Sequence, residues 1–209
     1  MRAFIYTGGP VALDGITDFP EEGDLVIAAD SGYKTAKALS VKVHTVLGDF
    51  DSCPIDDIES DAEILSVPSE KDFTDTQMAA QIALSRGASI LYIIGGLSGR
   101  LDHTLSNLGL LEDLYAKGIR ATMCDGNNRV RFLRNSGELI PRSQFRYFSL
   151  LVADDRVKGV SVEGGKYPLK NATLYRTSQY AISNEIEKNC ALINVKKGGL
   201  FIIESRDPS

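Results

Sequence analysis

The chain has 209 residues, 43% of them hydrophobic and 24% charged, which is enough for one large or two small domains with buried cores. Its net charge of -5 argues against an extended basic surface for nucleic acid, but is compatible with a nucleotide whose phosphate charge is offset by a metal ion. Cys53, Cys124 and Cys190 are odd in number and widely separated. The N-terminal apolar run is too short for a signal peptide or a membrane span. We therefore expect reduced thiols and a cytoplasmic protein.

The first part of the chain alternates between strand-like and helix-like patterns. A capping-box spacing at Thr74-Asp75-Thr76-Gln77 precedes an apolar stripe that ends near Gly87, and a second helical repeat runs from Leu101 to Tyr115. This alternation predicts an α/β domain with a Rossmann-like, mostly parallel sheet and helices on both faces. The expected strands are aliphatic runs typical of buried parallel sheets, at Ala3–Tyr6, Leu25–Ala29, His44–Leu47, Ile64–Val67 and Ile90–Ile94.

After the Asp125-Gly126-Asn127-Asn128 turn the pattern changes to short strands separated by turn residues. No convincing helical period intervenes, so an antiparallel sandwich or barrel is expected. We place the domains at residues 1–127 and 128–209. The expected strands of the second domain are Arg129–Leu133, Phe145–Val152, Val157–Val162, Ala191–Val195 and Leu200–Ile203.

Carboxylates cluster at the predicted carboxyl ends of two strands. Asp49 and Asp51 follow one apolar run and Asp30 ends another. Open α/β sheets bind their ligands at this edge, and repelling carboxylates gathered there favour a cation such as Mg²⁺, which prefers oxygen ligands. The alternative is an ordinary turn, in which Gly, Asp and Ser are common.

The segment Lys71-Asp72-Phe73-Thr74-Asp75 also has two interpretations. Thr74 can simply cap a helix whose first turn favours acids. The same helix N-terminus, with Lys71 beside it, can instead bind phosphate, and its carboxylates would then require a metal. The spacing alone does not decide between cap and site.

A glycine-rich stretch, Gly95–Gly99, follows the run that ends at Ile94 and precedes Arg100 and His103. Such a loop suits close approach of backbone to a ligand, and the fork of Arg100 suits a phosphate. The stretch is neither a Walker A loop nor a G-x-G-x-x-G fingerprint. His103 is a candidate for orienting or protonating a ligand. Farther along, Ser183-Asn184-Glu185 is by itself an ordinary polar turn.

Taken together and in this order, the motifs resemble those of the thiamine pyrophosphokinase family. The resemblance implies an α/β nucleotide-binding domain and a C-terminal β-sandwich that binds thiamine and forms a homodimer, with each active site between subunits. The motifs are Ala29-Asp30-Ser31-Gly32, Gly48-Asp49-Phe50-Asp51-Ser52, Lys71-Asp72-Phe73-Thr74-Asp75, Gly95-Gly96, Gly99-Arg100-Leu101-Asp102-His103, Asn107 and Ser183-Asn184-Glu185.

The resemblance further implies transfer of diphosphate from Mg·ATP to the hydroxyl of thiamine, with release of AMP. The metal ligands would be Asp49, Asp51 and Asp75, and the carboxylate supporting catalysis would be Asp72. The residues expected to bind the nucleotide are Asp30, Lys71, Thr74, Arg100, Asp102 and His103, and those near thiamine are Ser183, Asn184 and Tyr180.

Family members often stack a tryptophan on thiamine, whereas this chain has no Trp. Tyr175 or Tyr180 is the expected aromatic replacement. Two other functions stay open on the sequence: a kinase or diphosphotransferase for another small alcohol, and a non-catalytic sensor of nucleotide or thiamine diphosphate.

Overall fold

The computed structural model describes residues 1–49, 58, 61–67, 72–178 and 180–207. The chain divides into two compact units, Met1–Gly126 and Asn127–Ser209. We describe each unit by itself.

The first unit is built on six strands in the order β6-β5-β1-β2-β3-β4, and every neighbouring pair is parallel. Strands β1, β2 and β5 are aliphatic and almost wholly buried, as expected for a sheet covered on both faces. The strands are β1 (Arg2–Tyr6), β2 (Leu25–Ala29), β3 (Thr45–Gly48), β4 (Glu63–Ser66), β5 (Ile90–Ile94) and β6 (Arg120–Cys124).

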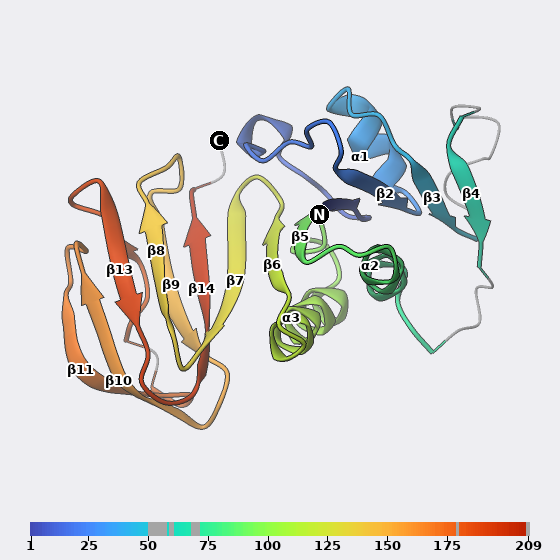
Figure 1. Ribbon diagram of the computed structural model, residues 1–209. Helices are drawn as coiled ribbons and strands as arrows, with labels where there is room; N and C mark the ends of the chain where they lie inside the picture. The colour runs from blue at the N-terminus through green and yellow to red at the C-terminus, as the bar shows by residue number, and fades with distance from the viewer. Residues whose placement is uncertain (50–57, 59–60, 68–71, 179, 208–209) are drawn as a thin grey trace. The chain divides into compact units, whose positions relative to one another are not determined.

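Helices cover both faces of this sheet, with α1 on one face and α2 and α3 on the other (Figure 1). Small side chains, Ala79, Ala80 and Ala83, form the buried face of α2 and allow close packing on the central strands. The predicted α/β architecture is therefore confirmed. The helices are the short 3-10 turn η1 (Leu13–Gly15), α1 (Gly32–Ala38), α2 (Asp75–Ser85) and α3 (Leu101–Ala116). No helix in the described ranges is long and apolar enough to cross a membrane.

The order of the strands creates a switch point between β1 and β5. From β1 the chain builds the sheet outward through β2, β3 and β4, and then returns to add β5 and β6 on the other side of β1. The loops after β1 and β5 therefore leave in opposite directions. In open α/β sheets this divergence opens a crevice at the carboxyl edge, where ligands bind.

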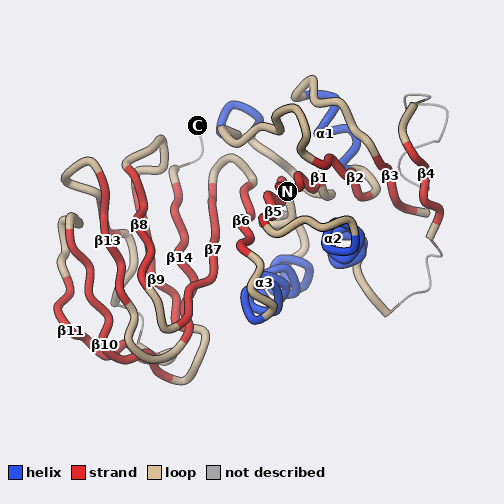
Figure 2. Tube along the Cα trace, viewed as in Figure 1, coloured by secondary structure: helices blue, strands red, loops and turns tan. Residues whose placement is uncertain are grey.

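The described residues of the second unit form two antiparallel four-stranded layers without a helix (Figure 2). One layer has the order β12-β9-β14-β7 and the other β11-β10-β13-β8. The first layer comprises β7 (Asn128–Arg134), β9 (Tyr147–Val152), β12 (Asn184–Glu185) and β14 (Gly199–Ser205). The second comprises β8 (Gly137–Pro141), β10 (Arg156–Glu163), β11 (Leu169–Tyr175) and β13 (Cys190–Asn194).

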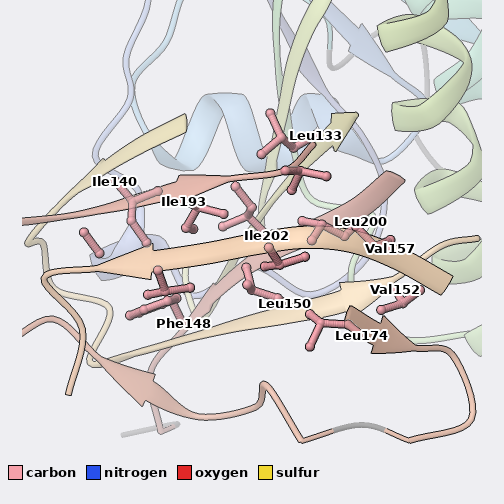
Figure 3. Packing of buried hydrophobic residues seen from close by; sticks show 14 of the residues in the cluster. Leu133, Ile140, Phe148, Leu150, Val152, Val157, Leu174, Ile193, Leu200 and Ile202 are labelled. Atoms are coloured by element: carbon pink, nitrogen blue, oxygen red, sulfur yellow. The ribbon is translucent and has the colours of Figure 1, made fainter. Parts of the chain in front are cut away.

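The core of the second unit lies between these layers, as Figure 3 shows. Its side chains alternate along each strand: Leu200 and Ile202 of β14 join the core cluster, while Phe201 between them packs edge-on against Phe132, with 5.2 Å between ring centroids. Burying each aliphatic side chain of this kind contributes about 1.5–3 kcal/mol. Two sheets facing across one apolar core are a β-sandwich, as predicted.

Candidate active site

A cavity of about 470 Å³ lies at the carboxyl edge of the parallel sheet. It is lined by the loops after β1, β2 and β5 and by the residues that open α2 and α3. The loops after β1 and β5 are the two that diverge at the switch point, so the cavity occupies the position expected for the ligand of an open α/β sheet.

Two glycine-rich loops line this cavity, and one hydrogen bond joins them to each other while a second joins the loop after β5 to α3. Ser98 Oγ donates a hydrogen bond of 2.6 Å to the carbonyl oxygen of Pro10, and the buried Asn107 amide donates one of 2.9 Å to Gly96. Gly96 has φ 76°, and a Cβ there would lie 2.7 Å from Nδ2 of Asn107. Only glycine allows the loop to bend this way against Asn107, and the bare backbone is left facing the cavity.

The N-terminus of α2 brings a carboxylate to the same cavity. Thr74 forms the predicted capping box with Gln77, because its Oγ1 accepts from Gln77 N at 3.2 Å and its own N–H donates to Oε1 at 3.0 Å. Asp75 is the first helical residue and lines the cavity. Next to it, the hydroxyl of Thr76 shares a buried hydrogen bond of 2.6 Å with Thr7, which anchors the helix start to the loop after β1.

Asp30 and Asp49 follow neighbouring parallel strands. Asp30 lines the cavity, its backbone N–H donates to Leu47 O at 2.8 Å, and its φ of 49° turns the chain sharply at the end of β2. Asp49 is exposed directly after β3. The fold thus brings Asp30 and Asp75, from distant parts of the sequence, to one cavity and places Asp49 at the adjacent strand end.

Arg100 immediately precedes α3 and lines the cavity, as does His103 in the first turn of that helix. The guanidinium of Arg100 pairs with both carboxylate oxygens of Asp102, Nε at 3.1 Å and Nη2 at 2.6 Å. This hydrogen bonding lowers the pKa of Asp102 to about 2 and raises the pKa of Arg100. Asp102 is not among the residues that line the cavity, and it contacts the guanidinium of Arg100, which does line it.

Three further predicted site residues are not among the described residues that line the cavity. Asp72 is exposed and is not among the residues that line the cavity. Asp51 and Lys71 lie outside the described residues.

Within the described ranges, no three His, Cys, Asp or Glu side chains come close enough together to hold a metal ion. Among the described lining residues, Arg100 is the sole side chain with a permanent positive charge, and Asp30 and Asp75 line the same cavity. A site of this composition is chemically suited to Mg²⁺, with ligands shared between protein carboxylates and phosphate oxygens.

The second unit has a smaller apolar pocket of about 80 Å³. Tyr180 lines it, as does Asn184, and so do the sandwich residues Phe148 and Leu150. Tyr167 also lines it and is 59% exposed, so its ring forms part of the rim. A pocket of this size contacts one side of a small ring rather than enclosing it.

Ser183 and Asn184 differ in their surroundings. Ser183 is exposed in a left-handed conformation with φ 57°, and its backbone N–H donates to Ser149 Oγ at 3.0 Å. Asn184 is buried, and its side chain is bonded to the backbone of Tyr167. Tyr175, the other aromatic expected to replace tryptophan, is not among the residues of this pocket.

Two groups of residues were not predicted from the sequence. The loop after β1, Thr7-Gly8-Gly9, lines the cavity, and its signal is the same strand-then-glycine pattern that indicated Gly95 and Gly96. Tyr167 is 17 residues from Asn184 in the sequence and meets it through the hydrogen bonds of the Asn184 side chain and the nearby bridge between Gly165 and Ile186. No local sequence signal identifies it.

Comparisons with known proteins agree with this two-unit arrangement. Residues 17–123 match the thiamin pyrophosphokinase catalytic domain, and residues 138–200 match the thiamin pyrophosphokinase vitamin B1 binding domain. A thiamine pyrophosphokinase of Bacillus subtilis (strain 168) is 31% identical over 209 residues, covering 97% of this chain and 98% of the relative.

Solved structures show the same fold over the full chain. The crystal structure of thiamine pyrophosphokinase from Bacillus subtilis aligns with a TM-score of 0.88 and 28% identity, covering 100% of both chains. That of a thiamin pyrophosphokinase family protein from Enterococcus faecalis aligns with a TM-score of 0.86 and 29% identity, again covering 100% of both.

Proposed function

The chain belongs to the thiamin pyrophosphokinase family, and we propose that its crevice binds ATP with Mg²⁺ while its sandwich binds thiamine. It is an enzyme that transfers diphosphate from ATP to the hydroxyl of thiamine, giving thiamine diphosphate and AMP. The observation that carries the assignment of the nucleotide site is the cavity at the switch point, which Asp30, Asp75 and Arg100 share.

We assign Asp49 and Asp75 as metal ligands together with Asp51, and Asp30 as their support. Asp30 and Asp75 face one cavity, and Asp49 follows the strand next to Asp30. When bound there, Mg²⁺ neutralises phosphate oxygens so that the hydroxyl of the acceptor can approach phosphorus.

The protein's own groups position the nucleotide. Backbone of the two glycine-rich loops and the N-termini of α2 and α3 supply dipoles of the sign that phosphate requires. Arg100 binds phosphate through the N–H groups that it does not donate to Asp102, with Lys71, Thr74 and His103 as further contacts. Attack is in line, by the thiamine hydroxyl on the β-phosphorus, and Asp72 or a neighbouring carboxylate accepts its proton.

The acceptor site is proposed for the apolar pocket of the sandwich. Tyr180 and Tyr167 offer aromatic surface beside aliphatic side chains, which suits a flat heteroaromatic ring. Ser183 directly precedes Asn184, which lines this pocket. As implied by the family resemblance, we propose a homodimer in which the α/β unit of one subunit and the sandwich of the other complete each active site. We also propose that the enzyme is cytoplasmic.

Product analysis tests this function. The purified protein is incubated with Mg²⁺, ATP and thiamine, and nucleotides and thiamine phosphates are separated. We expect AMP and thiamine diphosphate in equal amounts. Formation of ADP and thiamine monophosphate would refute diphosphate transfer. Turnover of another alcohol in an acceptor panel, without turnover of thiamine, would refute thiamine as the acceptor. Tight ligand binding without turnover would indicate a sensor.

Variants test the assignment of the metal site. Asp49→Asn and Asp75→Asn should each reduce turnover by about 10²-fold or more, because positioning of the metal fails. The control is Asp113→Asn, an exposed residue near the other end of α3. Asp75→Asn should also abolish the Mg²⁺-dependent rise in melting temperature that ATP produces. A normal Mg²⁺ response in both variants would show that these carboxylates do not hold the ion.

A further inference from the structure

The side chain of Asn184 is almost fully used by the protein itself. Its Oδ1 accepts from the backbone N–H of Tyr167 at 2.9 Å and from that of Glu185 at 2.9 Å, and its Nδ2 donates to Tyr167 O at 2.8 Å. An amide oxygen has two lone pairs and an amide nitrogen two N–H groups. Three of these four positions are therefore occupied, including both on the oxygen.

The surroundings keep this arrangement fixed. Asn184 is only 8% exposed, and a Cβ added at Gly165 would lie 2.9 Å from its Nδ2. The segment before Tyr167 pairs with the segment after Asn184, since Lys166 N donates to Glu185 O at 2.9 Å. Outside this pairing the ring of Tyr167 is 59% exposed at the rim of the apolar pocket.

We propose that Asn184 is a positioning residue: it clamps both backbone polar groups of Tyr167 and so fixes the aromatic wall against which the acceptor ring binds, without binding the acceptor itself. This inference rests on the proposed acceptor site and assigns a distinct role within it. The chemistry of the clamp supports it, because an oxygen with both lone pairs occupied has no position left to accept a hydrogen bond from the acceptor. The position left over is one N–H of Nδ2, and its direct donation to the acceptor is the alternative that the double-mutant cycle tests.

A double-mutant cycle on the full-length enzyme tests the proposal. The variants are Asn184→Ala, Tyr167→Ala and their combination, with Asn189→Ala in the following exposed turn as control. Losing the clamp should raise KM for thiamine about tenfold and leave KM for ATP unchanged, because hydrogen bonds that order a ring-bearing segment are lost only at the acceptor site. In the Tyr167→Ala background, Asn184→Ala should add less than about twofold, because the residue it positions is already gone.

Other results would overturn the proposal. KM values that multiply in the double variant would mean that Asn184 contacts thiamine directly, and an unchanged KM in Asn184→Ala would mean that the clamp does not matter. An equal loss for both substrates would indicate a general structural role. If Asn184→Ala does not fold, Gly165→Ala disturbs the same clamp by crowding the amide, and the same cycle is run with it.

A spectroscopic readout separates this inference from the proposed function. The chain contains no tryptophan, so Tyr167→Trp introduces a single reporter at the rim. Without ligand, adding Asn184→Ala should shift its emission and lower its anisotropy, and unchanged emission and anisotropy would overturn the clamp. This result does not depend on thiamine, whereas absence of thiamine turnover in the unmodified enzyme would refute only the proposed acceptor.

Discussion

The hydroxyl oxygens of Thr7 and Thr76 lie 2.6 Å apart in a buried hydrogen bond between residues 69 positions apart in the sequence. Thr7 begins the loop after β1, and Thr76 is the second residue of α2. Because Asp75 directly precedes Thr76, the bond fixes a proposed metal ligand relative to the central strand of the sheet. The contact therefore links folding of the α/β unit to the geometry of its site.

Replacing either threonine by valine should destabilise the protein by about 1–2 kcal/mol, because one buried hydroxyl loses its partner. The double variant Thr7→Val with Thr76→Val should be no less stable than either single variant, since no hydroxyl then remains unpaired. Urea denaturation of the four proteins measures this. Strictly additive losses would show that the two hydroxyls do not depend on each other.

The ion pair between Arg100 and Asp102 predicts that the carboxyl group of Asp102 titrates below its ordinary pKa. The pKa of Asp102 is lowered to about 2 from its ordinary value of 3.8, mainly because Arg100 donates hydrogen bonds to it. A depressed pKa stabilises the folded state above the unfolded value, and this stabilisation is lost as pH falls from 3.8 through about 2. Asp102 thus stays ionised throughout the neutral range, so its pairing with Arg100 is not lost by titration there.

Carboxyl NMR titration checks this, with Arg100→Gln as the comparison. We expect the pKa of Asp102 to rise toward its ordinary value in that variant, and KM for ATP to rise as a phosphate contact is lost. An Asp102 pKa that does not change on removal of Arg100 would contradict the pairing.

Strands buried on both faces were predictable because their aliphatic runs are continuous. The predicted runs Leu25–Ala29 and Ile90–Ile94 coincide with β2 and β5. Helix α1 was not predicted, since it is short and has no side-chain cap. It depends on tertiary contact: a Cβ at Gly32 would lie 2.1 Å from the carbonyl oxygen of Tyr6, so the helix starts against the backbone of β1.

The orientation of α3 was also beyond the sequence. Leu101 and Leu105 belong to the predicted apolar repeat, yet they are 69% and 58% exposed. The buried face contains Asn107, Leu110, Leu111 and Leu114, and of these only Leu111 belongs to the predicted repeat. Two leucine rows run along this helix, and periodicity alone cannot show which row faces the sheet.

The nucleotide side of the candidate site was easier to predict than the acceptor side. Asp30, Asp75 and Arg100 follow or open regular elements, so strand and cap signals locate them. Tyr167 and Asn184 meet through hydrogen bonds between the Asn184 side chain and the Tyr167 backbone. Such a contact has no characteristic spacing in the sequence.

Glu204 provides a prediction for the stability of the sandwich. It is 2% exposed and accepts from Arg129 Nε at 2.9 Å and Nη2 at 2.7 Å, and from Arg131. Glu204→Gln should reduce the free energy of unfolding by about 3 kcal/mol, because two partly buried guanidinium groups lose the charge of the carboxylate that they share. Arg131 keeps a second carboxylate partner, Glu138.

The matched control is Glu138→Gln, since Glu138 pairs with the same Arg131 but is more exposed. Its cost should stay within about 1 kcal/mol, as for surface ion pairs. Urea unfolding of both variants measures the difference, and equal losses would show that burial of Glu204 does not matter.

The proposed sharing of active sites between subunits predicts complementation. Under the proposed roles, Asp75→Asn should inactivate the α/β unit and Tyr167→Ala should impair the sandwich. In a mixed dimer with shared sites, one site carries both substitutions and the other carries neither. After denaturation, mixing in equal amounts and refolding, half of the dimers should be mixed, so about a quarter of normal thiamine turnover should return. If each site is formed within one chain, every site keeps one substitution and mixing restores nothing. Light scattering on the same samples establishes that dimers are present, and a monomer would contradict the proposal directly.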